Sequence, residues 1–427
     1  MKKILATFLC LLMFIGLAGC GALPAGSSAT RSTILHNGYA NAERNRLLQE
    51  DIAYFAKELP KRHKNLFTLL SKEAFEEQTS ALIAEADRLP NEQVFAHLAQ
   101  IMASIGDAHT RFNFWNGYDF PLQFYMFGTD IYVVNAEKGM EHLLYQKVTA
   151  VNGMPVADVL SRLATIIPHE NESYLKNALV RYLAAPVYLY GLGIITDKEQ
   201  ATFTFEIDGS PQEIALSARN AYETPIDFSI HTEDDVVLGT SSSSYSYTYL
   251  PDANAVHFSY NLCEGEDEFR TFNKHMFEEI TEKNVKKIIL DLRRNPGGNS
   301  EVLNPFTGQL KAYKETHPDV EVFLLTGRKT FSSGMFAIYR TMEAVPSAIS
   351  IGEPTGGALN CFGDIKTFSL PNSQIPIQYS TKYFEFSSMF SYKNKGTDTF
   401  IPDVLVPPSI EDYRVGNDAA LNYALSN

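Results

Sequence analysis

The sequence predicts a multi-domain protein that mixes α and β structure (α/β, α+β), and two patterns lead to that expectation. From about residue 251, apolar strand segments alternate with helical segments, which is typical of a parallel sheet with crossover helices. Between about residues 41 and 108, apolar residues instead recur at helical spacing. A chain of 427 residues is long enough for two or three domains of ordinary size.

The composition is that of a globular protein, and it excludes several classes of function. Hydrophobic residues make up 45% of the chain and charged residues 20%. The 36 basic and 50 acidic residues give a net charge of −14, which argues against a nucleic-acid partner because phosphate binding needs a basic surface. Four cysteines are too few for a disulfide framework. Neither C-x-x-C nor H-E-x-x-H occurs, and we expect no metal and no cofactor.

Residues 1–20 are typical of a bacterial lipoprotein signal peptide. Two lysines precede an apolar run over residues 4–18 that is short for a membrane span. The run ends in Leu17-Ala-Gly-Cys20, which resembles the lipobox and implies cleavage before Cys20 and a lipid on its thiol. A plain secretory signal is the alternative. With residues 21–40 as a tether, we expect an extracytoplasmic protein that is lipid-anchored to a bacterial cell membrane.

Two regions between the tether and the α/β alternation differ in pattern. Residues 41–118 are expected to form an N-terminal helical region, in which Asn91 caps one helix and Gly106 ends it. Residues 119–220 mix strands and helices, and residues 145–153 predict a strand that closes in an Asn-Gly turn. This stretch resembles the V-x-x-V-N-G pattern of PDZ domains, so a PDZ-like domain is expected. Any strand before a hairpin is the alternative.

The last region, residues 221–427, carries the alternation and three loops suited to acyl transfer. Strands and helices are expected in turn over 285–292, 299–316, 320–326, 332–344 and 348–352. The loops follow the strands, where sites gather in such sheets. They are Asp291-Leu-Arg-Arg-Asn-Pro-Gly-Gly298, Thr330-Phe-Ser-Ser-Gly334 and Gly352-Glu-Pro-Thr-Gly-Gly357.

Ser332 is the candidate nucleophile within these loops. It lies at a turn before a helix, where the helix dipole favours developing negative charge. The backbone N–H groups of Ser333 and of Gly297 or Gly298 are candidate donors of an oxyanion hole. A simple helix cap is the alternative role for Ser332.

The general base has to lie upstream in the chain. All ten histidines precede Ser332, which excludes the serine-then-histidine order of α/β-hydrolases. Together with Gly106-Asp-Ala-His-Thr110, the three loops resemble the C-terminal processing (tail-specific) serine peptidase family. The resemblance implies a ClpP/crotonase-like core, often with a PDZ-like domain and a helical N-terminal part. It also implies Ser332 as the nucleophile, with Gly297 or Gly298 and Ser333 as the oxyanion hole.

Within that family the chain resembles the tricorn-core branch. The other branch carries a lysine after the Gly-Glu-x-Thr-x-Gly element, where this sequence has Ala358. The tricorn-core branch takes a histidine from the N-terminal part, and His109 fits that position as general base. A structural histidine in a loop is the alternative. That branch also has a serine beside the histidine, where this chain has Ala108.

The third catalytic residue departs from the pattern of that branch. Gly396 occupies the place of its late glutamate, so Asp398 is the candidate acid and Glu385 the substitute. A solvated surface carboxylate is the alternative for each.

The leading hypothesis is a membrane-tethered, cofactor-free serine endopeptidase. Its substrates would be unstructured or C-terminal segments of extracytoplasmic proteins, as the resemblance implies. One alternative is a catalytically inactive binding lipoprotein on the same fold, and another is an esterase with the same Ser–His dyad. The expected partners are a polypeptide and, through the lipid, a membrane.

Three further residues carry expectations of their own. His63, within Lys-Arg-His-Lys, is expected on the surface. Cys263 and Cys361 lie near predicted strand ends, and we expect free, buried thiols there. A disulfide between them is the alternative.

Overall fold

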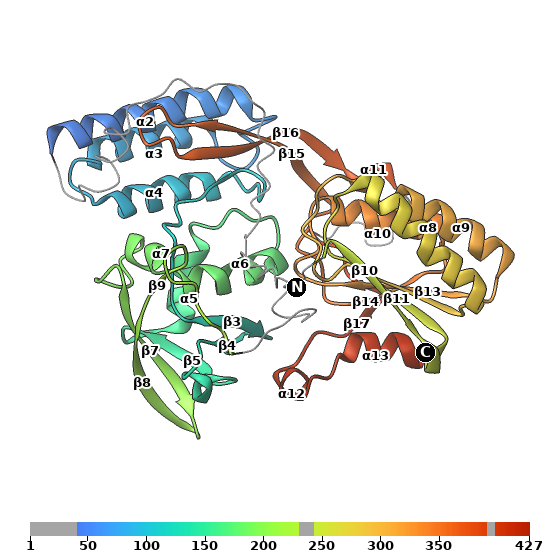
Figure 1. Ribbon diagram of the computed structural model, residues 1–427. Coiled ribbons are helices and arrows are strands. Elements are labelled where there is room, and N and C mark those ends of the chain that lie inside the picture. The colour runs from blue at the N-terminus through green and yellow to red at the C-terminus, as the bar shows by residue number, and fades with distance from the viewer. Residues whose placement is uncertain (1–40, 230–242, 391–397) are drawn as a thin grey trace, which may run out of the picture.

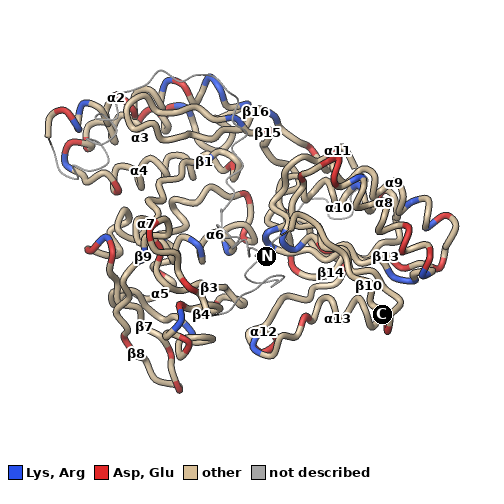
Figure 2. Tube along the Cα trace, in the orientation of Figure 1, with Lys and Arg blue, Asp and Glu red and all other residues tan. Residues whose placement is uncertain are grey.

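The structure, a computed structural model, describes residues 41–229, 243–390 and 398–427 and has a mixed α/β fold (Figure 1). The lipobox with Cys20, the tether and Gly396 lie outside these residues. Among the helices of the described ranges, none combines the length and the apolar character needed to cross a membrane. Acidic and basic residues interleave along the outer helices, as Figure 2 shows.

Three helices near the N-terminus confirm the predicted helical region. They are α2 (Ala42–Arg62), α3 (Lys72–Glu85) and α4 (Asn91–Ala103). The side chain of Arg44 is fully buried between them. Its Nη1 and Nη2 donate to the carbonyls of Ala86 and Leu89, at 2.6 and 2.7 Å, so that one guanidinium joins α2 to the α3–α4 connection.

The prediction that Asn91 caps α4 is wrong. Pro90 is the N-cap residue, and Asn91 is the first residue of the helix. The Asn91 side chain instead accepts a hydrogen bond from Nε of Arg44 at 2.8 Å. Gly106 follows the end of α4 with a φ of +74°, a conformation that favours glycine.

The middle of the chain forms an antiparallel sheet with the strand order β3-β4-β5-β7-β8. Its strands are β3 (Leu122–Phe127), β4 (Asp130–Ala136), β5 (Lys147–Val151), β7 (Gln200–Ile207) and β8 (Ser210–Ser217). Three helices accompany it, namely α5 (Val156–Ala164), α6 (Glu172–Ala184) and α7 (Pro186–Gly191). The predicted Asn-Gly turn is confirmed, because Asn152 and Gly153 have φ values of +47° and +75° and lead into β6 (Met154–Pro155).

The C-terminal sheet has the order β10-β11-β12-β13-β14-β17. Its strands are β10 (Tyr245–Leu250), β11 (Ala255–Tyr260), β12 (Lys287–Asp291), β13 (Glu321–Thr326), β14 (Ile349–Gly352) and β17 (Val404–Leu405). Strands β11 to β17 run parallel, and β10 is an antiparallel edge strand. The predicted alternation with a parallel sheet is therefore confirmed.

Helices cover both faces of this sheet (Figure 1). One face carries α8 (Glu266–Lys283), α9 (Asn304–Thr316) and α10 (Ser333–Ala344), and the other carries α13 (Ala419–Ser426), which follows the short α12 (Ile410–Arg414). Helix α9 begins five residues later than predicted, with Pro305 in its first turn, where the missing N–H is tolerated.

A long hairpin joins the C-terminal part to the helical region (Figure 1). Its strands are β15 (Asn360–Ser369) and β16 (Pro376–Glu385), followed by the short α11 (Phe386–Met389). Strand β16 pairs with β1 (Arg111–Phe112), with Gln378 opposite Arg111. The hairpin therefore links the chain just after residue 109 to the C-terminal part (Figure 1).

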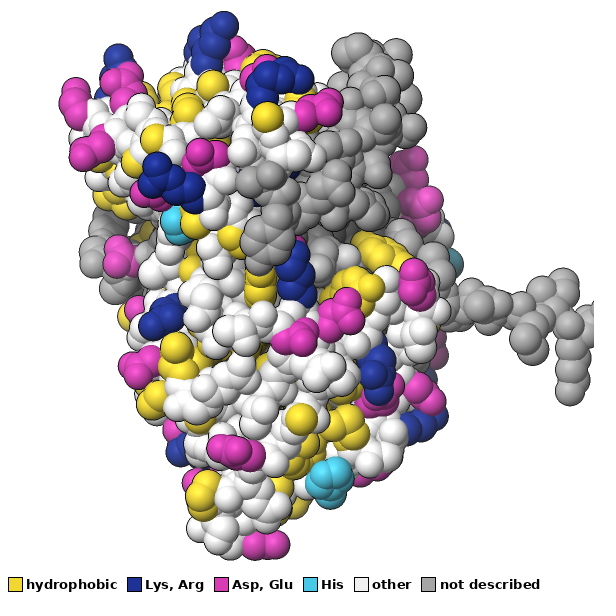
Figure 3. Space-filling view, turned by 90° about the vertical axis from the view of Figure 1, so that its left-hand side faces the viewer, with side chains coloured by type: hydrophobic (Ala, Val, Ile, Leu, Met, Phe, Trp, Pro, Cys, Tyr) yellow, Lys and Arg dark blue, Asp and Glu magenta, His cyan; other side chains and the backbone are white. Residues whose placement is uncertain are grey.

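The face formed by the helical region and the middle sheet has a mixed surface. Figure 3 shows hydrophobic, acidic and basic side chains there in small, separate groups. Strand β2 (Tyr118–Asp119) pairs with β9 (Arg219–Asn220), and Asp119 Oδ1 accepts a hydrogen bond from Trp115 Nε1 at 3.1 Å. Burial raises the pKa of Asp119 from 3.8 to about 6, although Arg181 and this hydrogen bond act in the opposite direction.

We predict that the Asp119→Asn variant is more stable than the wild type at neutral pH. The folded state binds the Asp119 proton more tightly than the unfolded state, so the wild type loses stability as the pH rises from about 4 to about 6. The loss corresponds to about 3 kcal/mol above that range. Urea unfolding at pH 4 and pH 7, followed by the fluorescence of the single tryptophan, measures it.

The Asp252→Asn variant is the matched control, because Asp252 is exposed. It should unfold like the wild type at both pH values. A difference between Asp119→Asn and the wild type that is the same at pH 4 and pH 7 would contradict the prediction.

Candidate active site

Ser332 lies on a strained turn between β13 and α10. Its φ and ψ are +53° and −121°, a conformation rarely adopted by residues other than glycine. The turn is held by the N–H of Phe331, which donates to the carbonyl of Asn295 at 3.0 Å. Although Ser332 is at the N-cap position of α10, its hydroxyl makes no capping hydrogen bond within the described residues. A helix cap therefore does not account for this serine.

The paired glycines contact this turn directly. Gly297 and Gly298 have φ values of +112° and +127°, which require glycine. A Cβ on Gly297 would lie 2.7 Å from Cβ of Ser332 and 2.9 Å from the nitrogen of Ser333. A Cβ on Gly298 would collide with the carbonyl of Cys263. The sequence therefore places bare backbone beside the serine.

Of the three predicted oxyanion donors, two have a free N–H group. The Gly297 N–H donates to Asn295 Oδ1 at 2.8 Å and is thereby occupied. Within the described residues, no hydrogen bond uses the N–H of Gly298 or of Ser333. Ser333 Oγ donates to the Gly298 carbonyl at 2.6 Å and holds the two segments together. The geometry thus leaves Gly298 and Ser333 available to a developing oxyanion.

His109 approaches this serine turn from the helical region. Its ring stacks on that of Phe331, the residue before Ser332, with 4.4 Å between the ring centroids and 24° between the planes. Its carbonyl accepts a hydrogen bond from Gln378 Nε2 on β16 at 2.7 Å. The bridging hairpin therefore helps to hold His109 beside the C-terminal part.

The His109 ring is buried and neutral. Its side chain is 8% exposed, and neither ring nitrogen has a hydrogen-bond partner within the described residues. Burial lowers the pKa of His109 to about 4; the charge of Asp107 acts in the opposite direction, and Arg111 adds a smaller lowering. A neutral imidazole has one nitrogen lone pair, which a general base needs.

Asp107 is a functional candidate that the sequence reasoning did not single out, although it lies within the Gly-Asp-Ala-His-Thr motif. Its Oδ1 accepts the backbone N–H of His109 at 2.8 Å and lies 3.9 Å from Nδ1 of that ring. Its Oδ2 accepts hydrogen bonds from His63 Nε2 at 3.0 Å and Thr110 Oγ1 at 2.6 Å. Burial acts to raise the pKa of Asp107, but the bond from His63, the nearby His109 and the Thr110 hydroxyl hold it below its ordinary value.

The prediction that His63 lies on the surface is wrong. Its side chain is fully buried, and the reason is the hydrogen bond to Asp107. The charged neighbours of His63 in the sequence gave no sign of this partner, which lies more than forty residues away.

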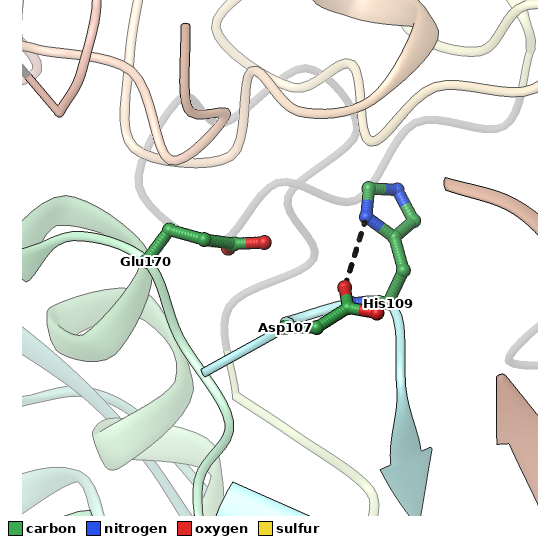
Figure 4. A group of neighbouring side chains, drawn as sticks. All are labelled: Asp107, His109 and Glu170. Atoms are coloured by element: carbon green, nitrogen blue, oxygen red, sulfur yellow. Dashed lines mark hydrogen bonds and ion pairs between the residues drawn. The ribbon is translucent and has the colours of Figure 1, made fainter. Parts of the chain in front are cut away.

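Glu170 completes a cluster with Asp107 and His109 (Figure 4). It precedes α6, and its Oε1 accepts the N–H of Ala108 at 3.1 Å. Burial, and next the charge of Asp107, raise the pKa of Glu170 to about 8. No motif marks this residue in the sequence, and its position is evident only once the two segments are folded together.

Neither acid proposed from the sequence contacts the histidine. Asp398 is exposed, and its carbonyl accepts a hydrogen bond from Asn171 Nδ2 at 3.3 Å. Glu385 is also exposed. Within the described residues, no hydrogen bond or ion pair joins either carboxylate to His109, and a role for Asp398 stays a prediction.

The two cysteines are buried and free, which confirms the expectation of unpaired thiols. Burial raises the pKa of Cys263 to about 11 and also raises that of Cys361. Neither thiol is thereby activated. Ala358, at the position where one branch of the resembled family has lysine, is buried as well.

Comparison with known proteins shows a shared fold. No protein-family model and no curated relative matches the sequence. The crystal structure of mature CPAF matches with a TM-score of 0.62 at 12% identity, and the match covers 89% of this chain and 96% of that chain. A putative peptidase from Parabacteroides merdae matches with a TM-score of 0.44 at 14% identity, covering 90% and 96%. The likeness to CPAF shows that the mixed α/β, multi-domain fold is common to both chains.

We predict that Gly298→Ala destabilises the protein. The positive φ and the collision with the Cys263 carbonyl together should lower the free energy of unfolding by about 3 kcal/mol. Thermal and urea unfolding, followed by circular dichroism, measure the effect.

Gly308→Ala is the matched control, because Gly308 lies within α9 and has nothing within 4 Å of an added Cβ. Alanine there should raise the stability by about 0.5–1 kcal/mol. Equal stabilities for the two variants would show that the Gly298 loop does not have the geometry described.

Proposed function

We propose that this protein is a serine peptidase of the C-terminal processing (tail-specific) family, with Ser332 as nucleophile and His109 as general base. The observation that carries the proposal is the strained Ser332 turn, which is flanked by free N–H groups and whose Phe331 stacks on the buried ring of His109. Such a turn exposes a side chain at a helix N-terminus, where negative charge is stabilised.

The residues fit the steps of acyl transfer. Ser332 Oγ attacks the substrate carbonyl while His109 takes its proton, and His109 then protonates the leaving amine. The N–H groups of Gly298 and Ser333 donate to the oxyanion. Water then hydrolyses the acyl-enzyme with the same base. In this scheme Asp107 is ionised and stabilises the imidazolium from 3.9 Å.

The hydrogen bond between Ser332 and His109 is expected to form when substrate binds. Both ring nitrogens lack partners within the described residues, but the Phe331 contact already places the ring beside the serine turn. Catalytic hydrogen bonds are often long in free enzymes and shorten in the substrate complex.

The remaining parts of the proposal concern the fold type, substrate and location. The parallel sheet with its flanking helices supports a ClpP/crotonase-like core, and the middle sheet supports a PDZ-like domain. The substrate is a polypeptide in an unstructured or C-terminal segment. The Leu-Ala-Gly-Cys20 motif supports a lipid anchor on the outer side of a bacterial cell membrane.

Two features favour the inactive binding protein as the second candidate. Ala108 stands where the resembled branch carries a serine. The two predicted acids, Asp398 and Glu385, are exposed, and within the described residues neither carboxylate forms a hydrogen bond or ion pair with His109. The esterase hypothesis shares the dyad with the peptidase, and only the choice of substrate separates the two.

We predict that a fluorophosphonate labels wild-type protein at Ser332, as located by mass spectrometry of the labelled peptide. Ser332→Ala should abolish the label, because the nucleophile is lost. His109→Ala should slow labelling by about 100-fold or more, because the serine loses its base. Protein that reacts with the fluorophosphonate is then assayed on unstructured polypeptides and on acyl esters. Cleavage of polypeptides indicates a peptidase, and cleavage of esters alone indicates an esterase.

Matched controls are Ser388→Ala and His275→Ala, since both residues are exposed. Both should label like the wild type. Folded wild type without label on Ser332 would overturn the hydrolase proposal in favour of a binding protein, whereas a label that persists in His109→Ala would overturn only the base.

We predict that Cys20→Ser moves the protein from the membrane fraction to the soluble fraction of a bacterial host, because the thiol that receives the lipid is lost. Fractionation and incorporation of labelled fatty acid measure this. Cys10→Ser, within the apolar run, is the control and should leave both unchanged. Fatty acid retained by Cys20→Ser would contradict a lipid on this thiol.

A further inference from the structure

Three potential metal ligands, the proposed base among them, lie close together. One ligand atom each of Asp107, His109 and Glu170 lies within 4.8 Å of the others. Two of the residues come from the loop after α4, and Glu170 reaches toward them from the segment before α6 (Figure 4). Glu170 is distant from Asp107 and His109 in the sequence, so the three residues do not form a zinc-binding motif. The expectation of no metal was based on the absence of such motifs.

The cluster contains buried polar atoms that have no partner. Both ring nitrogens of His109 and Oε2 of Glu170 are buried and unpaired within the described residues, and the His109 side chain is more than nine-tenths buried. Buried polar atoms in native proteins nearly always have a partner, so Oε2 of Glu170 and Nδ1 of His109, which faces Asp107 from 3.9 Å, indicate a missing ligand between these side chains. The His109 ring turns Nδ1 toward Asp107 (Figure 4).

The other atoms of the cluster are fixed by hydrogen bonds. Asp107 Oδ2 is held by His63 and Thr110, and Glu170 Oε1 by the Ala108 N–H. Outer hydrogen bonds of this kind orient the ligands of metal sites. One carboxylate oxygen on each acid therefore faces the histidine from a constrained position.

We propose that Asp107, His109 and Glu170 bind a divalent transition-metal ion, best matched by Zn²⁺, and that this ion inhibits the peptidase. One imidazole and two carboxylates form a three-ligand set that suits Zn²⁺ and leaves a position open. Mg²⁺ and Ca²⁺ prefer oxygen ligands alone. The proposal of metal binding depends only on the geometry of the cluster, whereas the proposal of inhibition also depends on the proposed function.

Inhibition follows from the single proton of a neutral imidazole. A metal ion on Nδ1 requires the lone pair of that nitrogen, so the ring proton must lie on Nε2. Nε2 is the nitrogen that points away from Asp107 (Figure 4). A protonated Nε2 donates a hydrogen bond and has no lone pair to take the proton of Ser332. The ion thus blocks the base without covering the serine.

The test of binding uses the full chain with Ser332→Ala, which removes the nucleophile and retains the cluster. Zn²⁺ is titrated by calorimetry into this protein and into the same protein carrying Glu170→Gln or, as the matched control, Glu172→Gln. Glu172 is exposed at the start of α6. We expect Glu170→Gln to weaken the tightest site about 10-fold or more and Glu172→Gln to leave it unchanged.

A second variant and a second metal keep the binding test decisive. His109→Gln should remove the same site, and circular dichroism verifies that each variant is folded. Co²⁺ bound to the cluster should give visible absorption bands that are lost in both variants. Equal Zn²⁺ affinity in Glu170→Gln, Glu172→Gln and the parent protein would overturn the metal site.

The test of inhibition is the fluorophosphonate reaction of the protein with an intact Ser332. Zn²⁺ should suppress labelling, EDTA should restore it, and Mg²⁺ should have no effect. Suppression that needs the same Zn²⁺ concentration in Glu170→Gln as in Glu172→Gln would overturn inhibition through this cluster. Metal-free wild type that is never labelled would overturn the proposed function, and the calorimetric result would still decide the metal site.

Discussion

The arrangement of the site depends on the hydrogen bonds that the buried carboxylate of Asp107 accepts. It binds His63 at the end of α2, the backbone of His109, and Thr110 before β1. Thr110 in turn accepts the N–H of Ser380 at 3.1 Å, so the network reaches the bridging hairpin. A buried ion is costly unless it is hydrogen-bonded throughout, and here every bond also fixes a segment of backbone. Because the buried charge of Asp107 has to be hydrogen-bonded, its partners are held in place, and His109, the proposed base, is one of them.

The bridging hairpin extends this control to the C-terminal part. Strand β16 pairs with β1, and Gln378 holds the carbonyl of His109, while the far end of the hairpin continues into α11. On the other side, the glycine loop and Phe331 bring Ser332 to the same place. The geometry of the proposed dyad thus depends on long-range pairing between β1 and β16 as much as on either loop.

Local patterns in the sequence were sufficient for the parallel sheet, its crossover helices and the Asn-Gly turn, because periodicity and turn chemistry act over a few residues. The loop of the proposed nucleophile and the loop of the paired glycines were equally visible as motifs. Asn91 and His63 were misjudged because their partners, Arg44 and Asp107, are distant in the chain. Glu170 could not be found at all, because only tertiary packing brings it to Asp107 and His109. A residue whose role depends on contacts with distant segments cannot be recognised from the sequence pattern around it.

The separation of Ser332 from His109 along the chain has a consequence for the order of events during folding. Contacts between distant segments form late, since a long loop must close before they stabilise anything. A molecule in which only the helical region or only the C-terminal sheet has formed has either a base or a serine, but not a dyad. In the proposed peptidase, the interval in which its own segments are exposed and cleavable therefore passes before cleavage is chemically possible. The division of the proposed site between two parts of the chain would in this way protect the nascent protein from its own activity.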